Sequence, residues 1–164
     1  HGVSEAIYLT DPEQQGLEIY ADRPREEWPY RGEELAMGTD PLDVDGLLAE
    51  APASRPEALP SGTVVGHVHL EVSDLEASEA FYAGELGLPV TQRSYPGALF
   101  LGAGGYHHHL GLNAWGGVRP RKAGEELQGL AEFEIRVPAG ALPDGEEIRR
   151  VDPDGIPLCI RPRG

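Results

Sequence analysis

Apolar and polar residues alternate most clearly in two segments of the chain. In residues 64–72, Val68, Leu70 and Val72 fall on one face, while two histidines and a glutamate fall on the other. In residues 130–137 the apolar positions again recur at every second residue. A period of two is that of a strand with one buried face. We therefore predict a half-buried β-strand in each segment.

A helix is predicted directly after the first of these strands. The run Ser73-Asp74-Leu75-Glu76 has the form of an N-terminal capping box, and apolar residues follow near helical spacing until Gly84 and Gly87. Turn signals of the Pro-Gly and Gly-Gly type separate three further candidate strands, at residues 89–95, 98–102 and 106–114. The predicted order from residue 63 is therefore β-α-β-β-β.

Two hairpins share a sequence pattern. Asp11-Pro12 followed by Leu17-Glu18-Ile19 recurs, at the same spacing, as Asp152-Pro153 followed by Leu158-Cys159-Ile160. The second copy ends a module that begins with the strand at 130–137, in which a short loop replaces the helix. The N-terminal copy is therefore expected to be the tail of a module whose beginning is absent, in agreement with a chain that starts at His1.

These patterns divide the chain into three parts. Residues 1–22 form an orphan β-hairpin from the end of an incomplete module. Residues 23–62, rich in Pro, Glu and Ala, are expected to be a surface linker with one short helix candidate at Val44 to Glu50. Residues 63–164 are expected to form one domain, and its second module is abbreviated.

Composition narrows the range of partners. The 164 residues suffice for one domain, and their formal charge of −15 repels phosphate backbones and anionic lipids. Nucleic acid and membranes are thus excluded as expected partners, and a small molecule is favoured. The single cysteine, Cys159, and the lack of a signal-peptide pattern at the first residues predict a cytoplasmic protein. Unpaired strand edges at the orphan hairpin favour a homodimer.

Four stretches of the chain resemble one family: residues 1–6 (HGVSEA), 22–29 (DRPREEWP), 66–70 (GHVHL) and 104–113 (GGYHHHLGLN). The family is the vicinal-oxygen-chelate superfamily of glyoxalases, bleomycin-resistance proteins and ring-cleaving dioxygenases, and the stretches are most similar to its catechol 2,3-dioxygenase branch. The resemblance implies an α+β fold in which paired βαβββ modules form curved mixed sheets around a cavity. Against that layout the chain is N-terminally shortened.

Alternation places potential metal ligands opposite the apolar face of each strand. They are His67 and His69; His107, His109 and Asn113; Glu132 and Glu134; and Cys159 and Arg161. The resemblance implies that His67 and Glu132 occupy first-strand ligand positions, and that His109 and Cys159 occupy last-strand positions. His67, His109 and Glu132 would complete a triad of two histidines and one carboxylate. Such a triad favours Fe(II), with Mn(II), Ni(II) or Zn(II) as alternatives.

The resemblance also implies roles around the metal. His107 or His108 is the candidate acid–base histidine, which would move a substrate proton near neutral pH. Asn113 is a candidate to hold a substrate oxygen, and Cys159 either lines the substrate site or is a small buried hydrophobe. Glu18 holds the family's carboxylate position in the N-terminal hairpin, with either a structural role or a role completed by another subunit.

Three functions follow from these observations. The first is a metal-dependent, extradiol-type dioxygenase-like protein acting on a catechol or a similar vicinal-oxygen substrate, with activity impaired by its departures from the family's ligand set. The second is a non-catalytic small-molecule binding protein of the bleomycin-resistance type. The third is an inactive remnant of a longer dioxygenase.

Overall fold

A four-stranded mixed sheet lies at the centre of the structure. The computed structural model describes residues 1–54, 56–120, 129–143 and 146–163. The strands of this sheet lie in the order β5 (Val68–Glu71), β8 (Leu110–Asn113), β7 (Ala98–Leu101) and β6 (Val90–Gln92). β5 and β8 are parallel, and the other pairs are antiparallel. With the helix between β5 and β6, the predicted β-α-β-β-β order is confirmed.

The helix after β5 begins one residue later than the capping box predicts. In α2 (Leu75–Glu79), the cap is Asp74, whose carboxylate accepts hydrogen bonds from the backbone N–H groups of Glu76 and Ala77. Ser73 instead donates its backbone N–H to Asp154, 3.0 Å away. The helix continues as a π-helical turn, η2 (Ala80–Glu85).

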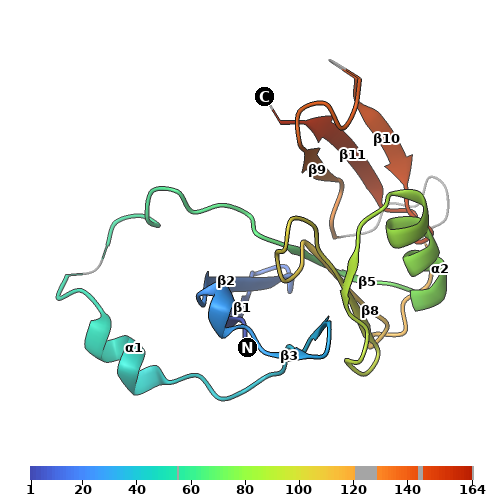
Figure 1. Cartoon of the computed structure of the whole chain (residues 1–164). Helices are drawn as coiled ribbons and strands as arrows, with labels where there is room; N and C mark the ends of the chain where they lie inside the picture. The colour runs from blue at the N-terminus through green and yellow to red at the C-terminus, as the bar shows by residue number, and fades with distance from the viewer. Residues whose placement is uncertain (55, 121–128, 144–145, 164) are drawn as a thin grey trace.

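A smaller three-stranded sheet repeats the same topology without a helix among its described residues. Its order is β10 (Ile148–Val151), β11 (Pro157–Pro162) and β9 (Phe133–Val137). As in the central sheet, the first and last strands of the module are parallel. The predicted C-terminal hairpin is confirmed as β10 and β11. Figure 1 shows this sheet beside α2, and Phe133, Leu158 and Ile160 share one core with β5, β7 and β8.

Both faces of the central sheet are covered. Along β7, Leu99 and Leu101 belong to the core shared with the C-terminal sheet, whereas Ala98 and Phe100 belong to a second core. The second core is completed by residues far away in the sequence, namely Val3, Trp28, Leu35 and Met37. The first part of the predicted linker therefore packs against the sheet. It packs there because it contains apolar and aromatic side chains, which are buried against this face of the sheet.

The N-terminal hairpin pairs β1 (Ser4–Thr10) with β2 (Gly16–Asp22). Its outward face is apolar and accessible: Ile7, Leu9, Leu17 and Ile19 are between 41% and 53% exposed. Glu18 and Tyr20 lie on the opposite face and are half-buried. The predicted hairpin is thus confirmed, and its polar face is the one that meets the rest of the protein.

Short elements follow the hairpin before the chain leaves the sheet. They are η1 (Arg25–Glu27), β3 (Tyr30–Arg31), β4 (Glu34–Leu35) and α1 (Val44–Glu50). The predicted helix at Val44 to Glu50 is confirmed with the same bounds, and Asp43 caps it. In Figure 1, α1 lies on a long excursion that stands away from the sheets before the chain returns to β5.

The predicted strand at 106–114 is shorter than alternation suggests. β8 begins only at Leu110, and the preceding histidines lie in an irregular segment. Gly104 and Gly105 have positive φ, and the side chain of Thr91 donates a 2.6 Å hydrogen bond to the carbonyl of His107. These features bend the segment away from strand geometry, so period-two reasoning does not apply to its side chains.

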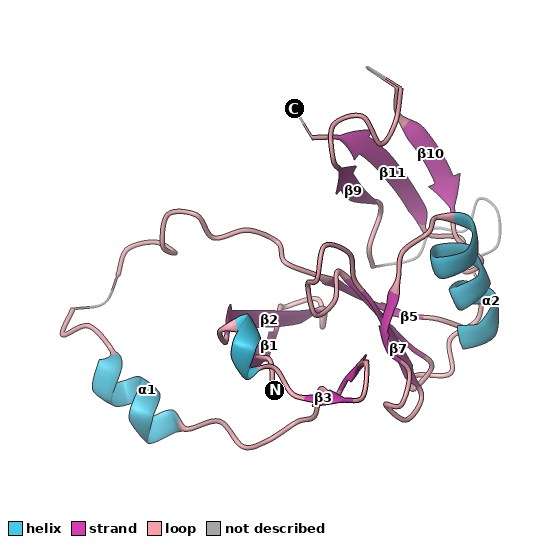
Figure 2. Ribbon diagram, in the orientation of Figure 1, coloured by secondary structure: helices cyan, strands magenta, loops and turns pink. Residues whose placement is uncertain are grey.

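The expected fold class is confirmed. Mixed sheets predominate over short helices, as Figure 2 shows, and the first and last strands of each module lie parallel. Among the described residues, no helix has the length and apolar character that crossing a bilayer requires.

Buried hydrogen bonds of Asp152 join the two modules. Its Oδ1 accepts the backbone N–H groups of Asp154 and Ile156 at 3.0 and 2.7 Å, and its Oδ2 accepts the hydroxyl of Tyr82 at 2.8 Å. Burial raises the pKa of this carboxyl despite these donors. In the N-terminal hairpin, Asp11 makes the equivalent backbone contacts, but at the surface.

We expect Asp152→Ala to lower the free energy of unfolding by about 2–4 kcal/mol, because it leaves three donors without their acceptor, one of them the buried Tyr82 hydroxyl. Asp11→Ala is the matched control, with a loss of about 1 kcal/mol or less, since water replaces an exposed acceptor. Urea unfolding followed by circular dichroism measures both. Equal losses in the two variants would contradict the assignment of Asp152 as the link between modules.

Candidate metal centre

Histidines gather on the face of the central sheet that the N-terminal segment covers. His67 and His69 stand at the start of β5, while His107 and His108 belong to the irregular segment before β8. Because β5 and β8 are paired in parallel, their N-terminal ends lie side by side. The sheet thus brings together rings that are about forty residues apart in the sequence.

The hairpin contributes a carboxylate to this group. Glu18 Oε2 lies 2.8 Å from His67 Nε2, and the hydroxyl of Tyr8 donates to Glu18 Oε1 at 2.9 Å. Burial disfavours the charge on Glu18, but the hydrogen bonds from His67 and Tyr8 outweigh it and hold the pKa of the carboxyl below its usual value. The carboxylate is therefore ionised and accepts a hydrogen bond from the N–H group at Nε2 of His67.

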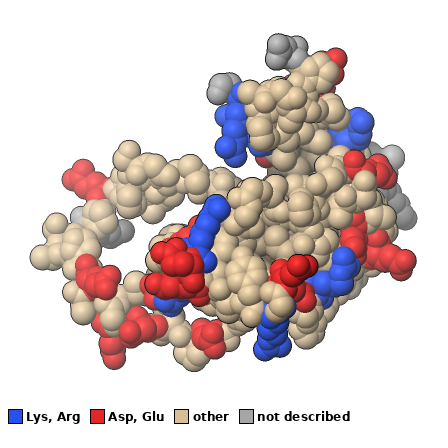
Figure 3. Space-filling model, viewed as in Figure 1, with Lys and Arg blue, Asp and Glu red and all other residues tan. Residues whose placement is uncertain are grey.

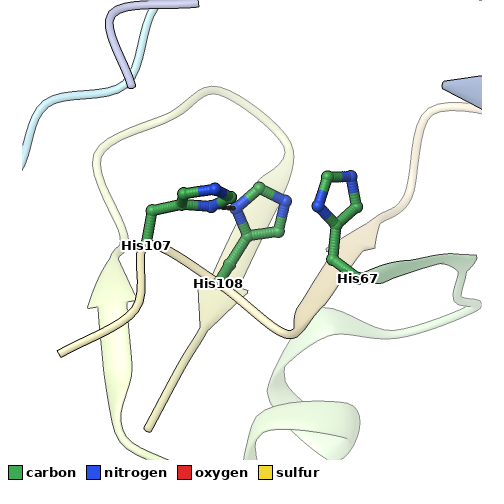
Figure 4. A group of neighbouring side chains, drawn as sticks. All are labelled: His67, His107 and His108. Atoms are coloured by element: carbon green, nitrogen blue, oxygen red, sulfur yellow. Dashed lines mark hydrogen bonds between the residues drawn. The ribbon is translucent and has the colours of Figure 1, made fainter. Parts of the chain in front are cut away.

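Among the residues that the structure describes, two sets of three residues have ligand atoms within 4.8 Å of one another. The first consists of Glu18, His67 and His69, and the second of His67, His107 and His108. Figure 4 shows the second set, with the ring of His108 between the other two. His67 belongs to both sets and is the residue on which the site is centred.

The imidazoles are linked by hydrogen bonds that begin at Asp22. Its Oδ1 lies 2.9 Å from His107 Nε2, His107 Nδ1 lies 2.7 Å from His108 Nδ1, and His108 Nε2 lies 3.2 Å from His69 Nε2. A neutral imidazole has one N–H and one lone pair. With Asp22 accepting from His107, His108 Nδ1 carries the hydrogen and His108 Nε2 carries the lone pair.

The surroundings keep these histidines neutral. Burial lowers the pKa of His108 far below its ordinary value, and the positive charge that His67 can carry adds to the effect. Desolvation of the ring by the surrounding protein, together with the electrostatic effect of His67, lowers the pKa of His69 to about 4, although part of the residue reaches solvent. Burial also lowers the pKa of His107, even with Asp22 beside it. Neutral imidazole is the form that binds a metal ion.

The residues present fit a divalent metal ion. His67 Nδ1 is buried and has no hydrogen-bond partner among the described residues. Buried polar atoms are rarely left in that state, and an ion is one of the groups that satisfies them. On the Nε2 side of the same ring, which faces Glu18, the residues Glu18, His67 and His69 bring together two imidazoles and one carboxylate, the donor set of non-haem Fe(II) sites.

An aromatic contact holds the hairpin in position. The ring of Tyr20 stacks on His67, with centroids 4.7 Å apart and planes at 24°, and its hydroxyl lies 2.8 Å from that of Tyr106. Gly66 makes this approach possible, because a Cβ at this residue would overlap the hydroxyl of Tyr20. Glu18, two residues before Tyr20 on the same face of β2, reaches His67 because the hairpin is docked in this way.

The structure does not bring Glu132 and His109 to this group. Glu132 is exposed just before β9 and forms an ion pair with Arg149, with 2.9 Å between Oε2 and Nη1. His109 Nδ1 accepts the backbone N–H of Ala103 at 3.3 Å. Among the described residues, neither belongs to a set with metal-binding geometry. Of the predicted triad His67, His109 and Glu132, only His67 lies at the centre.

The remaining predicted residues are placed as follows. His107 and His108 are buried beside His67. Asn113 is buried in β8, where its Oδ1 accepts the backbone N–H of Trp115 at 3.4 Å. Cys159 is completely buried in β11, with Arg161 Nε 3.2 Å from its Sγ. Neither Asn113 nor Cys159 belongs to the ligand sets of the described residues.

Sequence reasoning missed two residues that shape the site. Tyr8 belongs to no motif, and Asp22, although it opens the family-like stretch 22–29, was given no role in the site because its partner His107 lies 85 residues away. Glu18 was signalled by its equivalence to the carboxylate of the family's hairpins. His69 was recognised as lying on the polar face of its strand.

Comparison with known proteins relates the chain to one family model and to a curated relative. The family model described as Glyoxalase/Bleomycin resistance protein/Dioxygenase superfamily matches residues 64–135. A catechol-2,3-dioxygenase from Bacillus subtilis (strain 168) is 45% identical over 141 residues, which are 84% of this chain and 49% of that protein. The chain therefore spans about half the length of this curated relative.

The solved structures match at lower identity. A glyoxalase/dioxygenase from Nostoc punctiforme has a TM-score of 0.50 at 17% identity, covering 68% of this chain and 99% of its own. A lactoylglutathione lyase from Agrobacterium tumefaciens has a TM-score of 0.43 at 18% identity, covering 64% of this chain and 96% of its own. At 17% identity, the likeness to the Nostoc punctiforme protein concerns the fold alone.

We expect Gly66→Ala to displace Tyr20 and to lower the free energy of unfolding by about 1–3 kcal/mol, through loss of the stacking and of the hydroxyl contact. Tyr20→Phe in the same background should restore part of that loss by removing the overlapping oxygen. Gly84→Ala is the control, since nothing lies within 4 Å of its Cβ. Urea unfolding compares the variants, and a Gly66→Ala protein as stable as Gly84→Ala would show that Tyr20 does not dock through this glycine.

Proposed function

The chain belongs to the glyoxalase/bleomycin resistance protein/dioxygenase superfamily, and we propose that it is a metal-dependent, extradiol-type dioxygenase whose ion is held by Glu18, His67 and His69. The observation that carries this proposal is the meeting of one carboxylate oxygen and two imidazole nitrogens within 4.8 Å. The proposed substrate is a catechol or a similar vicinal-oxygen compound, supported by the name of the Bacillus subtilis relative.

The donor set favours Fe(II), with Mn(II), Ni(II) or Zn(II) as alternatives. Glu18 supplies one negative charge and the imidazoles supply none, so a divalent ion in this site retains positive charge. Three protein ligands leave coordination positions for a substrate. The chemistry that such an ion supplies is chelation of vicinal oxygens and electron transfer between substrate and dioxygen.

The hydrogen-bonded histidines can accept a proton from a hydroxyl group of the substrate. His108 Nε2 carries a lone pair in the hydrogen-bonded arrangement, and it lies 3.2 Å from the ring of His69, next to the proposed ion site. A hydroxyl proton accepted there can be balanced by transfer from His108 Nδ1 to His107 Nδ1, 2.7 Å away, and from His107 to Asp22. His108 is therefore the proposed acid–base residue, and His107 and Asp22 hold its proton arrangement.

One observation favours a second function, binding of a small molecule without metal chemistry. A cavity of about 570 Å³ lies between β1 and residues 39–43 and is lined in part by Tyr8, whose hydroxyl contacts Glu18. Its charged lining is mainly acidic, with Glu5, Glu27, Asp40 and Asp43 against Arg23. Figure 3 shows acidic side chains gathered over this N-terminal part of the molecule. Such a cavity suits a neutral or cationic ligand.

A direct test compares the carboxylate that the structure brings to the site with the one that it does not. We expect Glu18→Gln to lower Fe(II) affinity and kcat/KM for a catechol by about a hundredfold or more, because even outer partners of metal ligands are worth ten- to a hundredfold. His67→Ala should abolish metal binding. Glu132→Gln and His109→Ala are matched controls and should retain both properties, since neither residue belongs to the ligand sets of the described chain.

The measurements are anaerobic metal analysis of the reconstituted protein and the visible absorption of the yellow ring-opened product. Loss of metal in Glu132→Gln together with full retention in Glu18→Gln would overturn the assignment. Stoichiometric metal without turnover of any catechol would remove the dioxygenase proposal and leave the metal centre. Ligand-induced thermal stabilisation without any metal requirement would favour the binding function.

A further inference from the structure

The two nitrogens of His67 face different surroundings. Nε2 lies 2.8 Å from Glu18, on the side of the proposed iron site. Nδ1 is buried without a hydrogen-bond partner in the part of the chain that the structure describes. In Figure 4 one nitrogen of His67 faces the ring of His108. One side of the ring is therefore used by the proposed function, and the other is left with an unsatisfied lone pair.

We propose that His67, His107 and His108 form a second divalent-cation site of three imidazoles, and that an ion there excludes an ion from the Glu18 side. The second part of this inference rests on the proposed function, which assigns Glu18, His67 and His69 to iron. The first part stands on the geometry of the three rings alone. We call this group the inner site.

The three rings are arranged around one another. Centroids of His67 and His108 are 4.3 Å apart, those of His107 and His108 are 4.6 Å apart, and each residue offers a nitrogen within 4.8 Å of the others. His107 and His108 are 1% and 6% exposed, so no bulk water competes at their nitrogens. The inner site is thus a dry group of neutral donors.

Asp22 prepares His107 for this role. Because its Oδ1 holds His107 Nε2 at 2.9 Å, Nδ1 is the nitrogen that His107 can offer. A carboxylate behind a histidine is the usual outer partner of a ring that binds a metal, where it fixes the tautomer and raises the basicity of the ligand. Glu18 holds Nε2 of His67 in the same way and leaves Nδ1 to the inner site.

Binding requires a small adjustment of two rings. His107 Nδ1 and His108 Nδ1 are 2.7 Å apart, joined by a hydrogen bond. Two nitrogens on a tetrahedral ion with bonds of about 2.0–2.1 Å are separated by roughly 3.3 Å. If His108 Nδ1 moves away by a fraction of an ångström, or if His108 offers its Nε2 instead, an ion can replace the hydrogen bond between the two rings. Three histidines with one open position are a common catalytic zinc geometry.

The ligands of the two sites select different ions. The inner site has imidazole nitrogens only, which suit Zn(II), Co(II) and Cu(II), whereas the carboxylate of Glu18 suits Fe(II) and Mn(II) as well. An ion on Nδ1 of His67 leaves the hydrogen on Nε2, where Glu18 accepts it. That hydrogen occupies the position that the iron would need. The inner ion therefore acts as an inhibitor of iron loading.

Cobalt(II) distinguishes the two sites by its spectrum. Four-coordinate Co(II) absorbs visible light strongly, whereas Co(II) with more ligands, as expected beside Glu18 and solvent, absorbs weakly. We expect the full chain titrated anaerobically with Co(II) to develop the strong bands. Glu18→Gln should keep them, because the amide oxygen of the substituted side chain would still accept the hydrogen of His67 Nε2. His107→Gln and His108→Gln should each weaken them at least tenfold, and His109→Ala is the matched control.

Two results would overturn the inner site: strong bands that persist in a folded His107→Gln or His108→Gln protein, or strong bands that disappear in a folded Glu18→Gln protein. Far-UV circular dichroism verifies that each variant is folded. Because two different substitutions remove the inner site, the misfolding of one variant leaves the other as the test.

Competition tests the exclusion separately. Saturation of the wild-type protein with Zn(II) should weaken Fe(II) binding at least tenfold, whereas in His107→Gln the same Zn(II) concentration should have a smaller effect. Equal Zn(II) effects in the two proteins would refute exclusion through His67. A protein that shows the cobalt bands but turns over no catechol would keep the inner site while the proposed function fails. Catechol turnover by a protein that lacks the cobalt bands would support the proposed function and refute the inner site.

Discussion

The contact between Glu18 and His67 is the interaction on which the rest of the site depends. It joins the N-terminal hairpin to the first strand of the central sheet, and the two atoms are 2.8 Å apart. Around it, Tyr20 stacks on the ring of His67 and Tyr8 donates to the carboxylate. Without the hairpin the sheet would present histidines alone, and the carboxylate required by a two-histidine, one-carboxylate site would be missing.

The N-terminal residues that pack on this face of the sheet also determine the protonation state of the histidines. Trp28, Leu35 and Met37 pack on the same face as Phe100 and enclose the segment that carries His107 and His108. Burial is the largest cause of the lowered pKa values of His107 and His108, so both rings are neutral at physiological pH. On a face that water could reach freely, the rings would keep the ordinary histidine pKa of about 6.5, and a larger fraction of them would carry a proton that repels cations.

The sequence was informative where local patterns determine structure. Alternation located β5, the shared Asp-Pro pattern located both hairpins, and α1 has its predicted bounds. It was less informative where contacts are distant in the chain. The segment before β8 is bent by glycines and by Thr91, so alternation misplaced its side chains, and the ion pair of Glu132 with Arg149 had no local signal. Asp22 reaches His107 across 85 residues, and only the fold shows it.

The long excursion that carries α1 adds a thermodynamic consequence. Glu18 and His67 are 49 positions apart in the chain, and the excursion that carries α1 lies between them. Closing a loop of that size costs several kcal/mol of chain entropy, in proportion to about (3/2)RT times the logarithm of its length. An ion that ligates both residues acts as a reversible cross-link across this loop. Metal binding and the anchoring of the first third of the polypeptide are then thermodynamically linked: whatever weakens one weakens the other.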